Sequence, residues 1–281
     1  MSTPDPGKKP PQPKSKPFDL INRGTKTPSP AGTLTFLGLR ALDIPLQLAL
    51  LSPTGPGISL LNSLGICNTI PHTAGAGVGS LLLAGMAGGA AAKQIYWLLA
   101  LGAERFPPSA AVAVSVFNTL VNGANALLFL AGASSGLTSR PLVTLPLPFS
   151  IPELGLEGEV TLPLSMLVGA GLYVAGLAIE TGAEVQRRAF KRKPGNEGRV
   201  CKTGLWAWVR HPNYAGYALW RGGYCMVATG WVGGIAMALF QGWDFATRAV
   251  VVLDGYCAER YKEQWTRFKE EVPYKLVPGI Y

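Results

Sequence analysis

Charged residues are scarce in this sequence, and the patterns that mark metal sites are missing. Only 15% of the 281 residues are charged and 48% are hydrophobic, whereas soluble domains carry about 25% charged residues. The four cysteines, Cys67, Cys201, Cys225 and Cys257, include no CxxC pair and no metal-ligand spacing, which favours free thiols or small core residues. The composition therefore points to the membrane, and we expect no metal site.

The first 33 residues also lack an apolar segment. They begin MSTPDPGKKPPQPKSKPFDL and are rich in Pro, Lys and Ser, so burial cannot offset the entropy lost on ordering them. A secretory signal peptide would need an apolar region here, behind a few charged residues. We therefore expect residues 1–33 to form a disordered cytosolic tail.

Long apolar runs fill most of the remaining chain. The hydrocarbon core of a bilayer needs about 20 mainly apolar residues in a helix. Six segments meet this requirement: 34–51, 76–102, 110–134, 160–181, 213–233 and 234–253. The sequence predicts an all-α fold, a polytopic membrane helix bundle of about six spans, whose last two spans form a hairpin. The glycines of the run GAGVGSLLLAGMAGGAAA indicate close helix packing, because no Rossmann strand and turn precede them.

Basic residues outnumber acidic ones by 25 to 16, which gives a net charge of +9. The excess is local, since residues 182–212 carry eight bases and two acids, or +6. Bases beside apolar spans mark the cytosolic side of a membrane protein, so this charge does not require nucleic acid as a partner. We expect this loop and both termini to lie in the cytosol.

The charged residues of the helix expected before this loop can either pair with one another or bind an anionic ligand. One face carries acids and bases three or four residues apart, at Glu180, Glu184, Arg188 and Lys191, and these can pair. This pairing leaves three further bases without obvious partners, namely Arg187, Arg192 and Lys193. Such a cluster can bind acidic lipid headgroups or nucleotide phosphates, and charge alone does not separate the two.

Three motifs lie in about the last 100 residues. The first is Arg210-His211-Pro212-Asn213-Tyr214, which follows Gly204-Leu205-Trp206. The second comprises Glu180, Ala183-Glu184, Gln186-Arg187 and Phe190, and the third is the ending DGYCAERYKEQWTRFKEEVPYKLVPGIY. Together they resemble the C-terminal region of the steroid 5-alpha-reductase-like and sterol-reductase membrane superfamily.

The resemblance implies membrane helices with a cytosol-facing pocket for NADPH. It divides the chain after the tail into an N-terminal transmembrane bundle, 34–160, and a reductase-like cofactor-binding membrane region, 161–281. The implied cofactor-binding residues are Gln186, Arg187, Lys191, Trp206, Arg210, His211, Asn213, Tyr214, Tyr261, Trp265 and Tyr274. Guanidinium groups suit phosphates because they form two parallel hydrogen bonds, and the aromatic residues supply flat apolar walls.

The activity implied by the resemblance is reduction of a carbon–carbon double bond in a sterol-like or other apolar lipid, in the endoplasmic reticulum. Candidate proton donors are Tyr217, Tyr224 and Glu180. The same superfamily includes isoprenylcysteine and phospholipid methyltransferases, which share Arg-His-Pro-x-Tyr and bind S-adenosylmethionine. Asn213 in this motif and the ending VPYKLVPGIY favour the reductase. A non-catalytic lipid-binding membrane protein is the third reading.

Polar residues inside the spans indicate where an apolar substrate binds. Asn118, Asn122 and Asn125 are spaced by four and three residues, so they form one stripe that faces the bundle. We expect this stripe to line the substrate cavity. Charged residues at membrane depth are costly and therefore often functional. Arg40, Asp43 and Lys93 are expected either to have a functional role or to form structural ion pairs. Lys93 can also extend its side chain toward the membrane surface. His72 is expected in a solvated turn.

Overall fold

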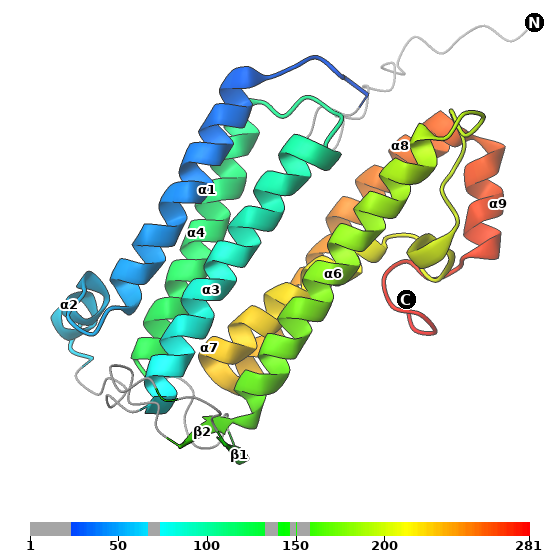
Figure 1. Cartoon of the computed structure of the whole chain (residues 1–281). Coiled ribbons are helices and arrows are strands. Elements are labelled where there is room, and N and C mark those ends of the chain that lie inside the picture. Colours follow the sequence, from blue (N-terminus) through cyan, green and yellow to red (C-terminus); the bar gives the residue numbers. More distant parts are fainter. Residues whose placement is uncertain (1–23, 67–73, 133–139, 147–149, 151–157) are drawn as a thin grey trace, which may run out of the picture.

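The computed structural model describes residues 24–66, 74–132, 140–146, 150 and 158–281 (Figure 1). Most of the expected tail, together with Cys67 and His72, lies outside the described residues. The first helix begins at Pro30, so residues 30–33 belong to it and not to a tail. Proline suits the first turn of a helix because its missing N–H has no partner there anyway.

The described residues form a bundle of long helices. The helices are α1 (Pro30–Leu51), α2 (Pro56–Ser63), α3 (Ala74–Tyr96) with its π-helical continuation η1 (Trp97–Leu101), α4 (Pro108–Leu130), α6 (Leu164–Arg192), the 3-10 helix η3 (Gly204–Ala207), α7 (Pro212–Asp244), the π-helix η4 (Phe245–Ala249), α8 (Val250–Tyr261) and α9 (Glu263–Glu271). Within the described ranges, five helical segments are long and apolar enough to cross a membrane: 30–51, 76–101, 108–130, 164–192 and 212–261. The predicted membrane helix bundle is confirmed.

The fifth of these segments is folded back on itself within α7. Gly230 has non-helical backbone angles, φ 74° and ψ −164°, a left-handed conformation that favours glycine. A Cβ added to Gly222 would lie 2.7 Å from the Cβ of Ala238, although a straight helix would separate these residues by about 24 Å. The segment is therefore an antiparallel pair of arms, 212–229 and 231–261. This confirms the expected hairpin, with its turn at residue 230.

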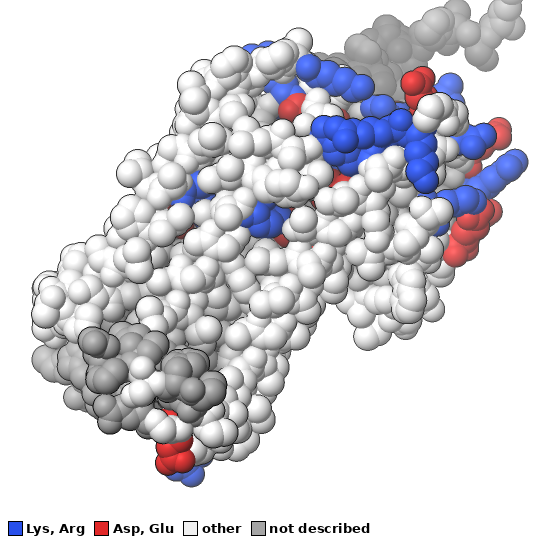
Figure 2. Space-filling model, in the orientation of Figure 1, with Lys and Arg blue, Asp and Glu red and all other residues white. Residues whose placement is uncertain are grey.

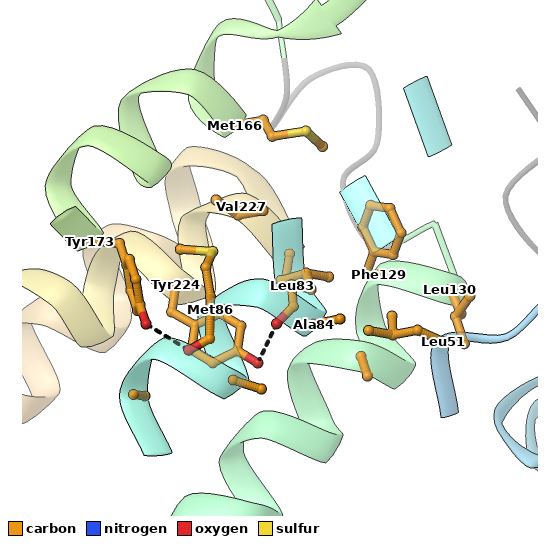
Figure 3. Packing of buried hydrophobic residues seen from close by; sticks show 14 of the residues in the cluster. Leu51, Leu83, Ala84, Met86, Phe129, Leu130, Met166, Tyr173, Tyr224 and Val227 are labelled. Atoms are coloured by element: carbon orange, nitrogen blue, oxygen red, sulfur yellow. Dashed lines mark hydrogen bonds between the residues drawn. The ribbon is translucent and has the colours of Figure 1, made fainter. Parts of the chain in front are cut away.

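One group of helices, α1, α3 and α4, packs beside the α6–α7 pair (Figure 1). Two tyrosines fasten the pair to α3, as Figure 3 shows. Tyr173 of α6 donates its hydroxyl to the carbonyl of Met86 at 2.6 Å, and Tyr224 of α7 donates to the carbonyl of Leu83 at 3.1 Å. Both rings belong to the main apolar core, so the core and these bonds together join the two groups.

Glycines bring α6 and α7 into backbone contact. A Cβ on Gly176 would collide with the backbone of Trp220 and Gly216, and one on Gly169 with the backbone of Gly223. In lipid, such small residues let helices approach closely enough for van der Waals attraction to hold them together. The spacing of α6 and α7 therefore depends on these positions.

A two-stranded antiparallel sheet, β1 (Leu142–Pro146) and β2 (Glu159–Pro163), lies at the end of the bundle where α6 begins. The fourth apolar segment was expected to be helical from residue 160, and this was wrong. Val160 and Leu162 are buried while Glu159 and Thr161 are exposed, the two-residue period of a strand. The helix begins only after Pro163.

Candidate cofactor site

Lys and Arg gather at the opposite end of the molecule, around α9 and the end of α6 (Figure 2). We call this the basic end. There the C-terminal tail, residues 272–281, folds back onto the start of α7. The backbone N–H groups of Arg210 and His211 donate to the carbonyls of Tyr274 and Lys275, each at 2.9 Å. The tail therefore joins the first and third motifs.

His211 lies at the centre of the basic end. Its side chain is 1% exposed, and neither ring nitrogen has a hydrogen-bond partner among the described residues. The ring stacks on Tyr214 with centroids 5.5 Å apart and lies 6.5 Å from Trp265. Burial, and then the charge of Arg210, lower the pKa of His211 to about 3. The neutral ring therefore holds one unused donor and one unused acceptor.

Asn213 joins the first motif to the second. Its amide donates to Glu184 Oε1 at 2.9 Å, and Arg187 donates to Glu184 Oε2 at 2.6 Å. Glu184 is buried, and Asn213 Oδ1 is buried without a hydrogen-bond partner in the described part of the chain. The expectation that Arg187 lacks a partner was wrong. Residues three and four positions away are both within reach of a helical side chain. Glu184 pairs with Arg187, three positions along, where the sequence predicted Arg188, four positions along.

The other two expected phosphate-binding bases are also engaged. Lys191 donates to the hydroxyl of Tyr261 at 3.0 Å and to the carbonyl of Arg199. Arg210 is buried, its Nη2 donates to the carbonyl of Pro273 at 3.4 Å, and burial lowers its pKa. Its Nε has no hydrogen-bond partner in the described ranges.

The remaining cofactor candidates connect to these residues. Trp206 donates its ring N–H to the carbonyl of Ala183 at 2.8 Å, and Gln186 Oε1 accepts the N–H of Leu205 at 2.9 Å. Both contacts hold η3 against α6. Tyr261 lies against Trp265, and Tyr274 contributes the carbonyl that receives Arg210. The structure thus brings all the cofactor candidates together at the basic end. Gln186 belongs to this group because it contacts η3.

The three proton-donor candidates lie deeper in the bundle. Glu180 forms an ion pair with Lys93 and accepts the ring N–H of Trp220 at 2.7 Å. Tyr217 accepts a hydrogen bond from Arg221 at 3.1 Å. Tyr224, which is bonded to Leu83, lies about 20 Å along α7 from His211 at 1.5 Å per residue. The structure does not bring these three into contact with His211.

The asparagine stripe faces the interior of the bundle, and Asn118, Asn122 and Asn125 are all buried. Asn122 donates to Asp43 at 2.8 Å and accepts from Arg221 at 3.2 Å, while Asn125 accepts from the thiol of Cys225 at 3.1 Å. Arg40 and Asp43 form the expected ion pair at 3.0 Å. Sequence reasoning missed Arg221, although a lone arginine within an apolar run could have revealed it.

Acidification tests the environment of His211. Between pH 3 and its ordinary pKa of 6.5, the unfolded chain binds a proton that the buried ring does not. The free energy of unfolding should therefore fall by about 1.4 kcal/mol per pH unit below 6.5 and be unaffected by this group above it. Denaturation of the natural protein and His211→Phe at pH 4.5 to 7.5 checks this, because only the natural protein carries the contribution. Parallel pH profiles would contradict it.

Comparison with known proteins identifies the family. The model of the family described as "Protein of unknown function (DUF1295)" matches residues 141–271. The probable O-methyltransferase ustE of Ustilaginoidea virens is 33% identical over 254 residues, which cover 86% of this chain and 84% of that protein. The chain belongs to the steroid 5-alpha-reductase-like membrane superfamily. The resemblance of the three motifs is thereby confirmed, and the protein is an integral membrane protein.

Two other members of the superfamily are similar to less than half of the chain. The Delta(14)-sterol reductase of Methylotuvimicrobium alcaliphilum is 29% identical over 130 residues, which cover 39% of this chain and 29% of the reductase. The Protein-S-isoprenylcysteine O-methyltransferase of Saccharomyces cerevisiae is 25% identical over 107 residues, which cover 38% of this chain and 44% of the methyltransferase. The superfamily thus holds both reductases and methyltransferases.

Proposed function

We propose that this protein transfers a methyl group from S-adenosylmethionine to an oxygen atom of an apolar acceptor within the membrane. The observation that carries the proposal is the buried Glu184 at the centre of the candidate site, where it orients Asn213. Glu184 also pairs with Arg187 at 2.6 Å, so a base that could hold a phosphate is engaged, while Asn213 Oδ1 is left as a buried acceptor for a ligand that carries an ammonium or hydroxyl group. The likeness to a probable O-methyltransferase over both halves of the chain supports the same function.

The residues of the basic end fit such a donor. Asn213 Oδ1 and a ring nitrogen of neutral His211 can accept hydrogen bonds from an ammonium or hydroxyl group, and both are buried and unfilled within the described structure. Arg210 Nε is an unfilled donor for a carboxylate. Trp265 lies beside His211 and supplies an aromatic ring that can attract a cation, while Tyr214 stacks on the ring of His211 and so positions it. We therefore assign these five residues to the donor.

S-adenosylmethionine, when bound, would supply an electrophilic methyl group, whose bond to the sulfonium sulfur breaks so that S-adenosylhomocysteine is the leaving group. The acceptor oxygen must lose its proton when the new oxygen–carbon bond forms. We assign that proton to the carboxylate of Glu180, which lies one helical turn from Glu184; Tyr217 and Tyr224 stay candidate proton donors for the reductase alone. Lys93 pairs with Glu180 and Trp220 donates to it, so both orient its carboxylate.

Reduction of a carbon–carbon double bond with NADPH is the second candidate. It rests on the sterol-reductase-like ending and on the sterol reductases among the relatives. Arg187, Lys191 and Arg210 would then leave their present partners to hold phosphates. In that case the double variant Arg187→Ala, Lys191→Ala would lower the affinity for NADPH far more than the affinity for NADH, because only NADPH carries the 2'-phosphate.

Ligand binding by the purified protein separates these functions. We expect calorimetric titration to detect S-adenosylmethionine and not NADPH, and we expect a labelled methyl group to enter an apolar extract. Binding of NADPH alone would overturn methyl transfer in favour of the reductase. Binding of neither ligand would favour the non-catalytic lipid-binding protein.

We also propose that the basic end faces the cytosol, in the endoplasmic reticulum, as the charge asymmetry predicts. Cysteines introduced at Glu197 and Ile280, both exposed at that end, should react with an impermeant maleimide from the cytosolic side. A cysteine at Thr144 in β1 should react only from the other side. Labelling of all three positions from one side would contradict this orientation.

A further inference from the structure

A second polar cluster lies at the middle depth of the bundle, away from His211. Arg221 comes nine residues after Pro212 and nine before Gly230, so it lies about 14 Å from either end of its arm. Arg40 lies ten residues into α1. The hydrocarbon core of a bilayer is about 30 Å thick. Both guanidinium groups are therefore near the midplane, where charges are most costly.

The two arginines belong to one hydrogen-bonded network that links α1, α4 and α7. Arg40 and Asn122 both donate to Asp43 Oδ2, at 3.0 and 2.8 Å. Asn122 Oδ1 accepts Arg221 Nη1 at 3.2 Å. Gln47 adds a bond to Asp43 Oδ1 at 3.0 Å. Every member is at most 2% exposed, so solvent does not screen the charges.

The network holds two positive charges and one negative charge. The other contacts of Arg221 are neutral: it donates to Asn118 and Tyr217, and it stacks over Trp220 at 4.3 Å. The nearby acid Glu180 already pairs with Lys93. Among the residues that the structure describes, Arg221 thus has no carboxylate of its own. A buried charge without a counter-charge is strongly destabilising.

The same two arginines also carry unused donors. Arg40 Nε, Arg40 Nη2 and Arg221 Nε are buried and lack hydrogen-bond partners in the described ranges. Unfilled buried donors in native proteins are uncommon and call for a partner. A guanidinium group is the side chain best shaped to bind a carboxylate through two parallel bonds. The missing charge and the unfilled donors call for the same chemical group.

We propose that this network is a binding site for the carboxylate of a bilayer-soluble molecule, held by Arg40 and Arg221. The carboxylate supplies the missing negative charge, and its apolar remainder suits the depth of the site. The site is separate from the basic end and does not depend on whether that end binds S-adenosylmethionine or NADPH.

Oleate and oleyl alcohol test the proposal on the natural protein in neutral lipid nanodiscs. They share one hydrocarbon chain, and only oleate carries a carboxylate. At about a hundredfold excess over Kd, oleate should raise the Tm by roughly 5–10 °C, and oleyl alcohol should leave it unchanged. An equal effect of both, or an effect of neither, would overturn the proposal.

Two asparagine variants test whether Arg221 is the binder. Asn118→Asp places a carboxylate on the atom that accepts Arg221 Nη2. The new ion pair should outweigh the lost bond from the Asn118 amide to the carbonyl of Val114, so the variant should raise the Tm without oleate and remove the response to oleate. Asn125→Asp is the matched control, because Asn125 bonds the thiol of Cys225. It should lower the Tm and keep the response. A lower Tm for Asn118→Asp with an intact oleate response would place the fatty acid elsewhere and overturn the assignment to Arg221.

Discussion

Gly176→Val is expected to lower the Tm by about 10 °C and to abolish activity. The new side chain would meet the backbone of Trp220 and Gly216 across the α6–α7 contact, and backbone atoms cannot rotate away. Overpacking of this kind costs about 3 kcal/mol, which corresponds to a shift of this size in a chain of such length. It would also change the spacing between Glu184 and Asn213, which come from these two helices.

Gly171→Val is the matched control, on the same helix and with the same change. A Cβ at Gly171 meets nothing within 4 Å, so this variant should keep its Tm within about 2 °C. Thermal denaturation in one detergent measures both proteins. Similar losses in the two variants would show that valine itself weakens α6 and that the close helix contact is not the cause.

Asn213→Leu is expected to lower the affinity of the protein for S-adenosylmethionine by about 10- to 100-fold. The change removes the buried acceptor Oδ1 and leaves Glu184 without one of its donors. Hydrogen bonds to charged groups contribute about 1.5–3 kcal/mol, and each 1.4 kcal/mol is a factor of ten in affinity. Calorimetric titration of the purified variant gives the change directly.

Asn196→Leu is the control for this variant, since it removes the same amide elsewhere at the basic end. The Asn196 amide donates to the carbonyl of Phe190 at 3.1 Å, in the turn that follows α6, and does not contact Glu184. Its affinity for S-adenosylmethionine should stay within about twofold of the natural value. Unchanged affinity in a folded Asn213→Leu protein would remove Asn213 from the donor site.

The long apolar helices could be predicted from the sequence because membrane depth imposes a length that composition reveals. Their ends depended on local features, such as Pro30 at the start of α1 and the strand that delays α6 to Leu164. The short α2 escaped prediction because eight residues give little periodicity. The turn at Gly230 was expected only approximately, since several glycines in that run could have provided it.

The residues of the candidate site could be predicted from the sequence only in part. The motifs named the residues that meet at the basic end, because their spacing is fixed by α6, α7 and the tail. The pairing of charges could not be predicted, because Arg187 and Arg188 lie three and four positions from Glu184, both within reach on a helix, and only the structure shows that Glu184 pairs with Arg187. The partners of Arg221 could not be predicted, because Asn118 and Asn122 lie about 100 residues away in the chain and only the fold places them beside it.

The mid-depth position of Arg221 bears on how the protein is assembled during synthesis. An arginine at the centre of a lone apolar helix opposes release from the translocon into lipid. Here α1 and α4 are made before α7, so the acceptors Asn118 and Asn122 are already in the membrane when Arg221 emerges. The order of segments along the chain thus places the hydrogen-bond acceptors of Arg221 in the membrane before Arg221 itself, so α7 packs against helices that are already inserted.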